Sequence, residues 1–284
     1  MRIVTTKREL RAALAASEGE PRVLVPTMGA LHAGHAALLR QARELAGSSG
    51  TVVASVFLNP TQFDNAGDLA TYPRTPEQDM NLCEECGVDI LFMPDPQEMY
   101  RADRSISVEE DSLSRVLCGA SRPGHFAGVC LVVSKLFNLV QPTDAIFGKK
   151  DYQQLAILRR LVRDLDFPIN LHGANTVREK DGLAVSSRNV RLTPEHREAA
   201  PAIYAALCHA GESYARGDEC ASICAGVRSA LESIPGVRVD YAELVDAETL
   251  QPLQPGASGM ALLAVAAWFG DVRLIDNMEL PARA

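Results

Sequence analysis

The sequence predicts an α/β protein, in which a parallel sheet covered by helices on both faces is followed by a smaller α+β domain. Two observations support this prediction. Over residues 1–175, short apolar runs rich in β-branched residues alternate with helical patterns, as in parallel sheets whose strands are joined by helices. From about residue 176, long helices come first and apolar strands follow. We therefore expect a first domain at residues 1–175 and a smaller domain at residues 176–284.

Local signals place the elements of the first domain. Thr6 and Glu9 fit a capping box at a helix start. Thr75 followed by Pro76 indicates a second start, and that helix should end near Gly87. Further helices are expected at residues 34–46, 125–139 and 151–164, and strands at residues 22–26, 51–58, 89–93, 144–147 and within 168–177.

The smaller domain shows a different order of elements. Thr193 followed by Pro194 predicts the start of one long helix that ends near Arg216. A second helix is expected at residues 221–233, and apolar strands at residues 237–245 and 260–267. Since parallel sheets bind ligands beyond the carboxyl ends of their strands, the polar segments after each strand of the first domain are the places to look for chemistry.

Composition excludes several classes of protein. The net charge of −8 is unfavourable for sequence-independent binding to nucleic acid, which depends on Lys and Arg at phosphates. Seven cysteines, an odd number in a chain of 284 residues, argue against a secreted disulfide framework. Cys83 and Cys86 lack further ligands at zinc spacing, so we expect no metal site there. Without a signal-like or membrane-spanning apolar run, a cytoplasmic location is expected.

The segment PTMGALHAGH, residues 26–35, is the strongest candidate for a binding site. A strand ends, a glycine allows a tight turn and a helix begins. Helix N-termini offer free N–H groups and partial positive charge, which suit a phosphate. His32 and His35 are three residues apart, so both imidazoles can donate hydrogen bonds to charge that develops during phosphoryl or nucleotidyl transfer.

Polar side chains follow two other predicted strands. Asn59 and Gln62 come after the strand at residues 51–58, and their amides can bind a hydroxyl or a carboxylate. An ordinary polar turn is the alternative, because Asn-Pro is a turn dipeptide. GKKDYQQ, residues 148–154, follows the strand at residues 144–147; its lysines can neutralise phosphate and Asp151 can cap the next helix. A solvated cap is equally compatible with this segment.

Two more segments carry cationic residues. VSSRN, residues 185–189, offers two hydroxyls and a guanidinium that can clamp phosphate oxygens, or it is a polar linker between domains. In SRPGHF, residues 121–126, Arg122 could face a carboxylate or phosphate, and His125 is either catalytic or a helix cap.

Taken together, these segments resemble the pantothenate synthetase family. The likeness extends from residue 26 to residue 277, which is nearly the whole chain, and no single motif carries it. The stretches that resemble the family are PTMGALHAGH, SVFLNPTQF, YPRT, SRPGHF, VSKLFNLVQP, FGKKDYQQL, KDGLAVSSRN and AAWFGDVRLIDN. The family belongs to the nucleotidyltransferase-like group, whose H-x-G-H signature matches residues 32–35, so the resemblance implies a Rossmann-like sheet domain with a smaller C-terminal lid domain.

The resemblance also implies an activity and a set of contacts. The expected reaction is the ATP-dependent condensation of pantoate with β-alanine through a pantoyl-adenylate, with Mg²⁺ bridging phosphates and a homodimer as the assembly. The catalytic residues would be His35 as general acid, His32, Lys150 and Arg188. Pantoate would contact Gln62, Gln154 and Asn59, and Gln62 would also approach β-alanine. The residues expected to bind ATP are Met28, Gly29, Ala30, Leu31, His32, Ala33, Gly34, His35, Gly148, Lys149, Lys150, Asp151, Val177, Val185, Ser186, Ser187 and Arg188.

The chain departs from the family at one position. Lys149 stands where the family usually has glutamate, so the essential lysine maps to Lys150 and we expect Lys149 to face solvent.

Two other functions compete with the ligase. A nucleotidyltransferase or tRNA-charging relative would need a basic surface and an extra RNA-binding region, which the charge of −8 and the length of 284 residues do not favour. A non-enzymatic nucleotide-binding module would bind ATP without pyrophosphate exchange.

Overall fold

The computed structural model describes residues 1–17, 21–63, 66–254 and 259–283. The chain divides into two compact units. The first unit comprises Met1–Asp111, Arg122–Lys149 and Gln154–Asn175, and the second comprises Ser112–Ser121, Lys150–Gln153 and Thr176–Ala284.

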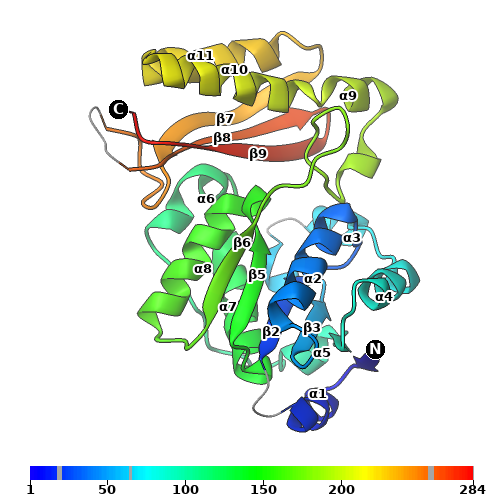
Figure 1. Ribbon diagram of the computed structural model, residues 1–284. Helices are drawn as coiled ribbons and strands as arrows, with labels where there is room; N and C mark the ends of the chain where they lie inside the picture. The colour runs from blue at the N-terminus through cyan, green and yellow to red at the C-terminus, as the bar shows by residue number, and fades with distance from the viewer. Residues whose placement is uncertain (18–20, 64–65, 255–258, 284) are drawn as a thin grey trace. The chain divides into compact units, whose positions relative to one another are not determined.

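The first unit is built on a parallel sheet, as the sequence predicts. Its strands lie in the order β1-β4-β3-β2-β5-β6, and every neighbouring pair is parallel (Figure 1). Val23, Leu24 and Val25 are all 0% exposed, as expected for a central strand buried on both faces. The strands are β1 (Arg2–Val4), β2 (Arg22–Thr27), β3 (Thr51–Val56), β4 (Ile90–Phe92), β5 (Asp144–Gly148) and β6 (Asn170–Ala174).

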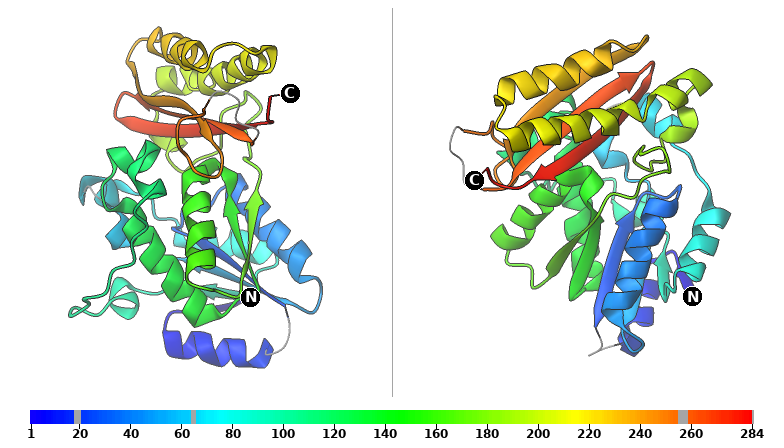
Figure 2. Two further views of the ribbon diagram at one scale, coloured as in Figure 1. Left: turned by 90° about the vertical axis from the view of Figure 1, so that its left-hand side faces the viewer. Right: turned by 45° about the horizontal axis from the view of Figure 1, so that its top comes forward.

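Helices cover both faces of this sheet (Figure 2). α2 (Ala33–Ala46) and α4 (Pro76–Glu85) bury Leu39 and Cys83 in one cluster with Val25, on one face. α1 (Lys7–Leu14) and α7 (His125–Val140) contact each other on the opposite face. α8 (Tyr152–Asp164) joins them there, because Leu155 packs against Gly173 while the next residue of β6, Ala174, belongs to the α2 cluster.

The chain path creates a switch point in the sheet. After β2 the chain continues to β3 on one side, whereas after β5 it continues to β6 on the other side. The connections after β2 and β5 therefore diverge on opposite faces, and a crevice for ligands forms beyond the carboxyl ends of such strands. The segments that begin at Met28 and at Lys149 follow these two strands.

The helix starts of the first unit follow from local chemistry. The capping box of α1 is confirmed, since the Thr6 side chain accepts from Glu9 N–H and the Glu9 carboxylate accepts from Thr6 N–H. Thr75 precedes Pro76 at the start of α4, but its hydroxyl donates to Asp79 and makes no cap bond. Short helices that were not predicted from the sequence are α3 (Ala66–Thr71), α5 (Pro96–Met99) and, in the second unit, α6 (Leu117–Ser121).

The second unit contains an antiparallel sheet in the order β7-β8-β9, covered on one face by α10 and α11 (Figure 2). Together with the parallel sheet of the first unit, this confirms the predicted fold class. The third strand was not predicted; it follows a tight turn at Gly270, which has a φ of 57°. The elements are α9 (Pro194–Ala199), α10 (Ala202–Arg216), α11 (Cys220–Glu232), β7 (Val237–Asp246), β8 (Ala261–Phe269) and β9 (Val272–Leu280).

The single long helix expected from Thr193 to Arg216 is wrong. It is two helices, α9 and α10, interrupted at Ala200 and Pro201. Proline has no N–H to donate to the preceding turn, and its ring clashes with the carbonyl four residues earlier, so the helical hydrogen bonding stops there. No helix among the described residues is both long and apolar enough to cross a membrane.

Candidate functional site

Two imidazoles stand at the N-terminus of α2. His32 is the N-cap residue, and its Nδ1 accepts a 3.2 Å hydrogen bond from Gly34 N–H. The Nδ1 of His35 accepts a 3.3 Å bond from His32 N–H, and the two ring centroids are 4.1 Å apart. Since both Nδ1 atoms are acceptors, this pattern assigns the proton of each neutral ring to Nε2. Both rings therefore carry an Nε2–H donor at a helix end that favours anions.

The turn that leads into α2 is held by a buried carboxylate. Gly29 and Ala30 have φ values of 86° and 51°, and the left-handed conformation is costly for alanine. Asp79 of α4, 1% exposed, accepts hydrogen bonds from Ala30 N–H at 3.1 Å and Leu31 N–H at 2.7 Å. The Thr75 hydroxyl donates to the same carboxylate at 3.0 Å. Asp79 is thus a site residue that the sequence analysis missed, because an acidic residue in a first helical turn ordinarily needs no distant partner.

Asn59 and Gln62 form one buried pair after β3. Asn59 Nδ2 donates to Gln62 Oε1 at 2.9 Å and to the Gly128 carbonyl at 3.1 Å. Asn59 Oδ1 accepts from the hydroxyls of Thr61 and Tyr100. Gln62 Nε2 has the Met28 sulfur as its acceptor, at 3.0 Å. Thioether sulfur is a weak acceptor, so this N–H can exchange it for a carboxylate or hydroxyl of a ligand.

Two residues of the SRPGHF segment, residues 121–126, bind the backbone carbonyl of Gln62. His125, the first residue of α7, donates from Nδ1 to the Gln62 carbonyl at 2.7 Å. Arg122 Nη2 donates to the same carbonyl at 3.3 Å. The N-cap of α7 is Gly124, so His125 is not the cap considered from the sequence. The imidazole of His125 and the guanidinium of Arg122 therefore both fix the position of the Gln62 backbone.

The GKKD segment forms a short 3₁₀ turn between β5 and α8. Lys149 packs over Gly173 of β6 within the first unit. Lys150 and Asp151 belong to the second unit, where the Lys150 ammonium lies 3.9 Å from the Asp151 carboxylate. Gln153 is 7% exposed and bonded to the backbone of Leu113, Val116 and Cys118. Gln154 follows it in α8 and is half-buried.

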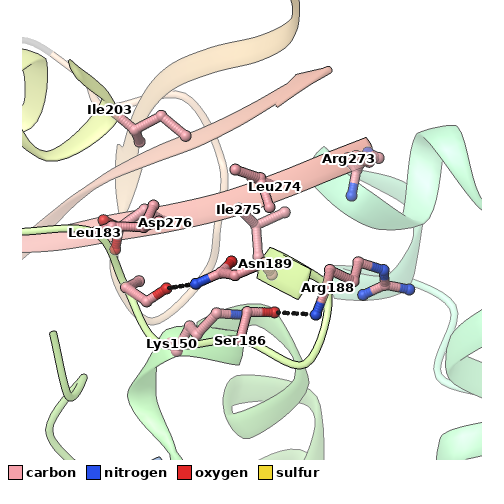
Figure 3. Close-up of a pocket in the computed structure, with 11 residues that line it drawn as sticks. Lys150, Leu183, Ser186, Arg188, Asn189, Ile203, Arg273, Leu274, Ile275 and Asp276 are labelled. Atoms are coloured by element: carbon pink, nitrogen blue, oxygen red, sulfur yellow. Dashed lines mark hydrogen bonds between the residues drawn. The ribbon is translucent and has the colours of Figure 1, made fainter. Parts of the chain in front are cut away.

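The second unit has a pocket with a cationic lining (Figure 3). Lys150, Arg188 and Arg273 line it together with one carboxylate, that of Asp276. Arg188 N–H donates to the Ser186 hydroxyl at 3.3 Å, which shapes the turn at residues 186–188. The remaining lining residues are Leu183, Ala184, Ser186, Asn189, Ile203, Leu274 and Ile275. Arg273 is paired with Asp240 through two hydrogen bonds, so Lys150 and Arg188 are the lining cations that suit phosphate oxygens.

Residues 177–189 form a hairpin with cross-links at several points. Val185 N–H donates to the Val177 carbonyl at 3.0 Å, and Glu179 N–H donates to the Leu183 carbonyl at 2.8 Å. Asn189 Nδ2 donates to the Ala184 carbonyl at 3.1 Å, which closes the turn that carries Ser186 and Ser187. Ser186, Ser187 and Arg188, which are predicted to bind phosphate, therefore lie in a turn whose backbone is fixed by these hydrogen bonds.

The predicted site residues thus gather in two sets. Within the first unit, Met28 and Gln62 touch, so the H-x-G-H segment and the Asn59–Gln62 pair meet. Within the second unit, Lys150, Ser186 and Arg188 line one pocket. Cys83 lies outside both sets; burial raises the pKa of its thiol to about 12, which disfavours the reactive thiolate.

Comparison with known proteins places these features in a family. The family model described as pantoate-beta-alanine ligase matches residues 2–279. The pantothenate synthetase of Akkermansia muciniphila is 60% identical over 282 residues, covering 99% of this chain and 100% of that protein. The pantothenate synthetase of Moorella thermoacetica is 51% identical and covers 90% of each chain.

Solved structures agree in fold. A crystal structure of pantothenate synthetase from Thermus thermophilus is 48% identical with a TM-score of 0.91, covering 99% of this chain and 100% of that chain. A pantoate-beta-alanine ligase from Francisella tularensis, complexed with beta-gamma ATP and beta-alanine, is 30% identical with a TM-score of 0.78, covering 98% of this chain and 97% of that one.

Proposed function

Because the chain belongs to the pantoate–β-alanine ligase family, we propose that it condenses pantoate with β-alanine through a pantoyl-adenylate, with release of AMP and pyrophosphate. The observation that carries the proposal is the pair of Nε2–H donors on His32 and His35. They stand at a helix N-terminus that directly follows the central strand β2. This is where the sheet topology favours an anionic ligand.

Each unit has its own proposed contacts with ATP. The turn and first residues of α2, residues 28–35, face the nucleotide together with Gly148 and Lys149 after β5. In the second unit, Lys150 and Asp151, Val177, and the hairpin residues Val185 to Arg188 complete the contacts. Support comes from the cationic lining of the pocket, where Lys150 and Arg188 lie beside Ser186. Residues 176–284 are proposed as the smaller domain, with the role of a lid that shields the adenylate from water.

Gln62 binds the carboxylate substrates in this proposal. Its Nε2–H has a sulfur as acceptor, so a pantoate hydroxyl or a carboxylate of either substrate offers a better one. Asn59 and Gln154 are the other proposed pantoate contacts. Both polar ends of the Asn59 side chain are engaged with the protein, which supports a second role for it in orienting the Gln62 amide.

The chemistry needs no covalent bond to the protein. A carboxylate oxygen of pantoate attacks the α-phosphorus of ATP, the bond to the β-phosphate oxygen breaks, and pyrophosphate leaves with the electron pair. The amine of β-alanine then attacks the acyl carbon, loses a proton, and AMP leaves. Negative charge grows on phosphate oxygens during the first step, so the Nε2–H groups of His32 and His35 and the cations Lys150 and Arg188 stabilise the transition state more than the ground state.

Magnesium is proposed to enter with the nucleotide. The described residues contain no group of three or more His, Cys, Asp or Glu side chains that could hold a metal by themselves. Mg²⁺ is commonly bound by substrate phosphates together with one or two protein carboxylates. Asp151, whose carboxylate lies 3.9 Å from the Lys150 ammonium, is the carboxylate proposed to contribute. When bound, the ion would neutralise charge on the phosphates.

An omission assay tests the function. Purified protein is given ATP, Mg²⁺, pantoate and β-alanine, and pyrophosphate and AMP are each followed by a coupled assay. We expect pyrophosphate release to require pantoate and AMP release to require β-alanine. AMP release without β-alanine, or pyrophosphate exchange without pantoate, would instead favour another nucleotidyl transfer. ATP binding without any turnover would favour a non-enzymatic module. The cytoplasmic location and the homodimer are further expectations of family membership.

A further inference from the structure

The segment AAWFGDVRLIDN ends in two polar residues of β9, Asp276 and Asn277, to which the proposed chemistry gives no role. β9 is an edge strand of the second unit, paired with β8 on one side. Asp276 is 4% exposed, although it is an acidic residue on an edge strand. Burying a carboxylate is costly unless it is paired and hydrogen-bonded. The partners of Asp276 therefore show which segments of the second unit β9 fixes in place.

Asp276 holds the base of the hairpin at residues 177–189. Arg178 pairs with it through two hydrogen bonds, from Nη1 to Oδ2 at 2.5 Å and from Nη2 to Oδ1 at 3.0 Å. The Arg178 guanidinium carbon also lies 3.7 Å from the ring centroid of Tyr204, and Nη1 donates to the Gly182 carbonyl at 3.2 Å. Arg178 bridges to Ala184 across the hairpin. The planar guanidinium of Arg178, held by Asp276 and Tyr204, therefore fixes both the position and the orientation of the hairpin.

Asn277 holds the turn that carries Lys150. Its Nδ2 donates to the Lys150 carbonyl at 2.9 Å, and its own N–H donates to Asp276 Oδ1 at 2.8 Å. The first bond constrains the backbone of Lys150 at the 3₁₀ turn of residues 149–151. It therefore constrains the origin of the lysine side chain in the pocket.

Strand geometry explains how neighbouring residues hold different segments. Leu274 and Leu280 of β9 face the cluster formed with α10 and α11, so Asp276 points to that face as well. Asn277 points to the opposite face. One edge strand thus binds the hairpin through Asp276 on one face and the Lys150 turn through Asn277 on the other. Figure 3 shows Asp276 beside the segment that leads to Ser186, with Lys150 below the same strand.

We propose that Asp276 and Asn277 are positioning residues for the ligase reaction. Through Arg178 and the Lys150 carbonyl, they set the separation between the two cations, Lys150 and Arg188, that bind the phosphates. This inference rests on the proposed function. Charge stabilisation depends steeply on geometry, and a displacement of about 1 Å can cost on the order of 10²-fold in rate.

The test uses Asn277→Ala and Asp276→Asn in the full-length protein. We expect each variant to lower kcat/KM for ATP on the order of 10- to 100-fold. The matched control is Asp246→Asn at the end of β7, in the same sheet. Asp246 accepts hydrogen bonds from Glu248 and Thr249 and lies outside the pocket lining, so its loss should lower the melting temperature and leave kcat/KM for ATP unchanged.

Non-additivity separates positioning from general stability. If Asn277 acts through Lys150, then Asn277→Ala should cost no more than about twofold when it is added to Lys150→Ala. A structural defect would instead multiply the two losses. The same comparison pairs Asp276→Asn with Arg188→Ala. If one variant fails to fold, the other pair still decides the question.

Each outcome decides a different claim. Near-normal kcat/KM in both Lys150→Ala and Arg188→Ala would remove the proposed phosphate site itself. Impaired Lys150→Ala and Arg188→Ala together with β9 variants that behave like Asp246→Asn would overturn the positioning role alone. Fully multiplicative losses in the double variants would also overturn it.

Discussion

The carboxylate of Asp79 accepts a 2.7 Å hydrogen bond from the N–H of Leu31, and the two residues are 48 positions apart in the chain. With the parallel bond from Ala30 N–H, this contact holds a left-handed turn just before the N-cap histidine of α2. The imidazole pair is therefore placed by α4 as well as by α2.

Replacing Asp79 tests this dependence. Asp79→Asn presents an amide N–H in place of one acceptor oxygen, so one of the bonds to the turn is lost. We expect a loss of about 1–3 kcal/mol in the free energy of unfolding and a fall in kcat/KM for ATP on the order of tenfold or more. Urea unfolding and steady-state kinetics measure the two effects. Glu77→Gln, an exposed residue in the first turn of the same helix, is the control and should change neither.

His35 and Lys150 are expected to act on the chemical step. His35→Ala and Lys150→Ala should each lower kcat on the order of 10²- to 10³-fold, because each removes a donor to the developing charge. Single-turnover formation of pyrophosphate, with ATP binding measured by calorimetry, separates chemistry from binding. His209→Ala is the control, since His209 is exposed on α10. Near-normal turnover with ATP binding intact would remove the substituted residue from the mechanism.

Gln62 is expected to act on carboxylate substrates. Gln62→Glu keeps the acceptor for Asn59 but replaces the Nε2–H donor with a negative charge. We therefore expect KM for pantoate and for β-alanine to rise on the order of tenfold or more, with KM for ATP little changed. An equal rise in all three KM values would indicate a general distortion of the site and would contradict direct binding by Gln62.

Acid should weaken the first unit through Asp144 of β5. Burial is the largest single influence and acts to raise the pKa of Asp144, but the hydrogen bonds from the His172 ring at 2.7 Å and from Thr143, together with the charge of the His172 ring and a bond from Asn170, outweigh it, so the pKa is lowered overall. The stabilisation is present above the unfolded value, near 3.9, and is lost as the pH falls through the lower folded pKa. Urea unfolding between about pH 5 and pH 3 should show this loss. Asp144→Asn should flatten the profile in that window, and an unchanged slope would contradict the assignment.

The proposed lid makes a prediction about exchange. If residues 176–190 close over bound nucleotide, their backbone amides should exchange more slowly with ATP and pantoate present than without them. Residues 221–232 of α11 provide an internal reference in the same unit. Equal exchange of residues 176–190 in both conditions would argue against closure.

All strands except β1 and β9, and most of the helices, were predictable because their signals are local. The apolar runs of β2 and β3, the capping box at Thr6 and the Thr-Pro starts all act over a few residues, so periodicity and cap chemistry identify them. The break at Pro201 is equally local, but the strong pattern on both sides concealed it. β9 escaped prediction because its polar positions, Asp276 and Asn277, interrupt the apolar alternation.

For the candidate site too, local features were predictable from the sequence and long-range contacts were not. The sequence alone determined which residue types follow each strand, because the order of strand, turn and helix is written in neighbouring residues. Only the tertiary structure decided that Asp79 meets Leu31, that Gln62 meets Met28, and that Arg178 and Lys150 are held by adjacent residues of β9. These contacts join residues far apart in the chain. Their geometry depends on how helices and strands pack, which local periodicity does not encode.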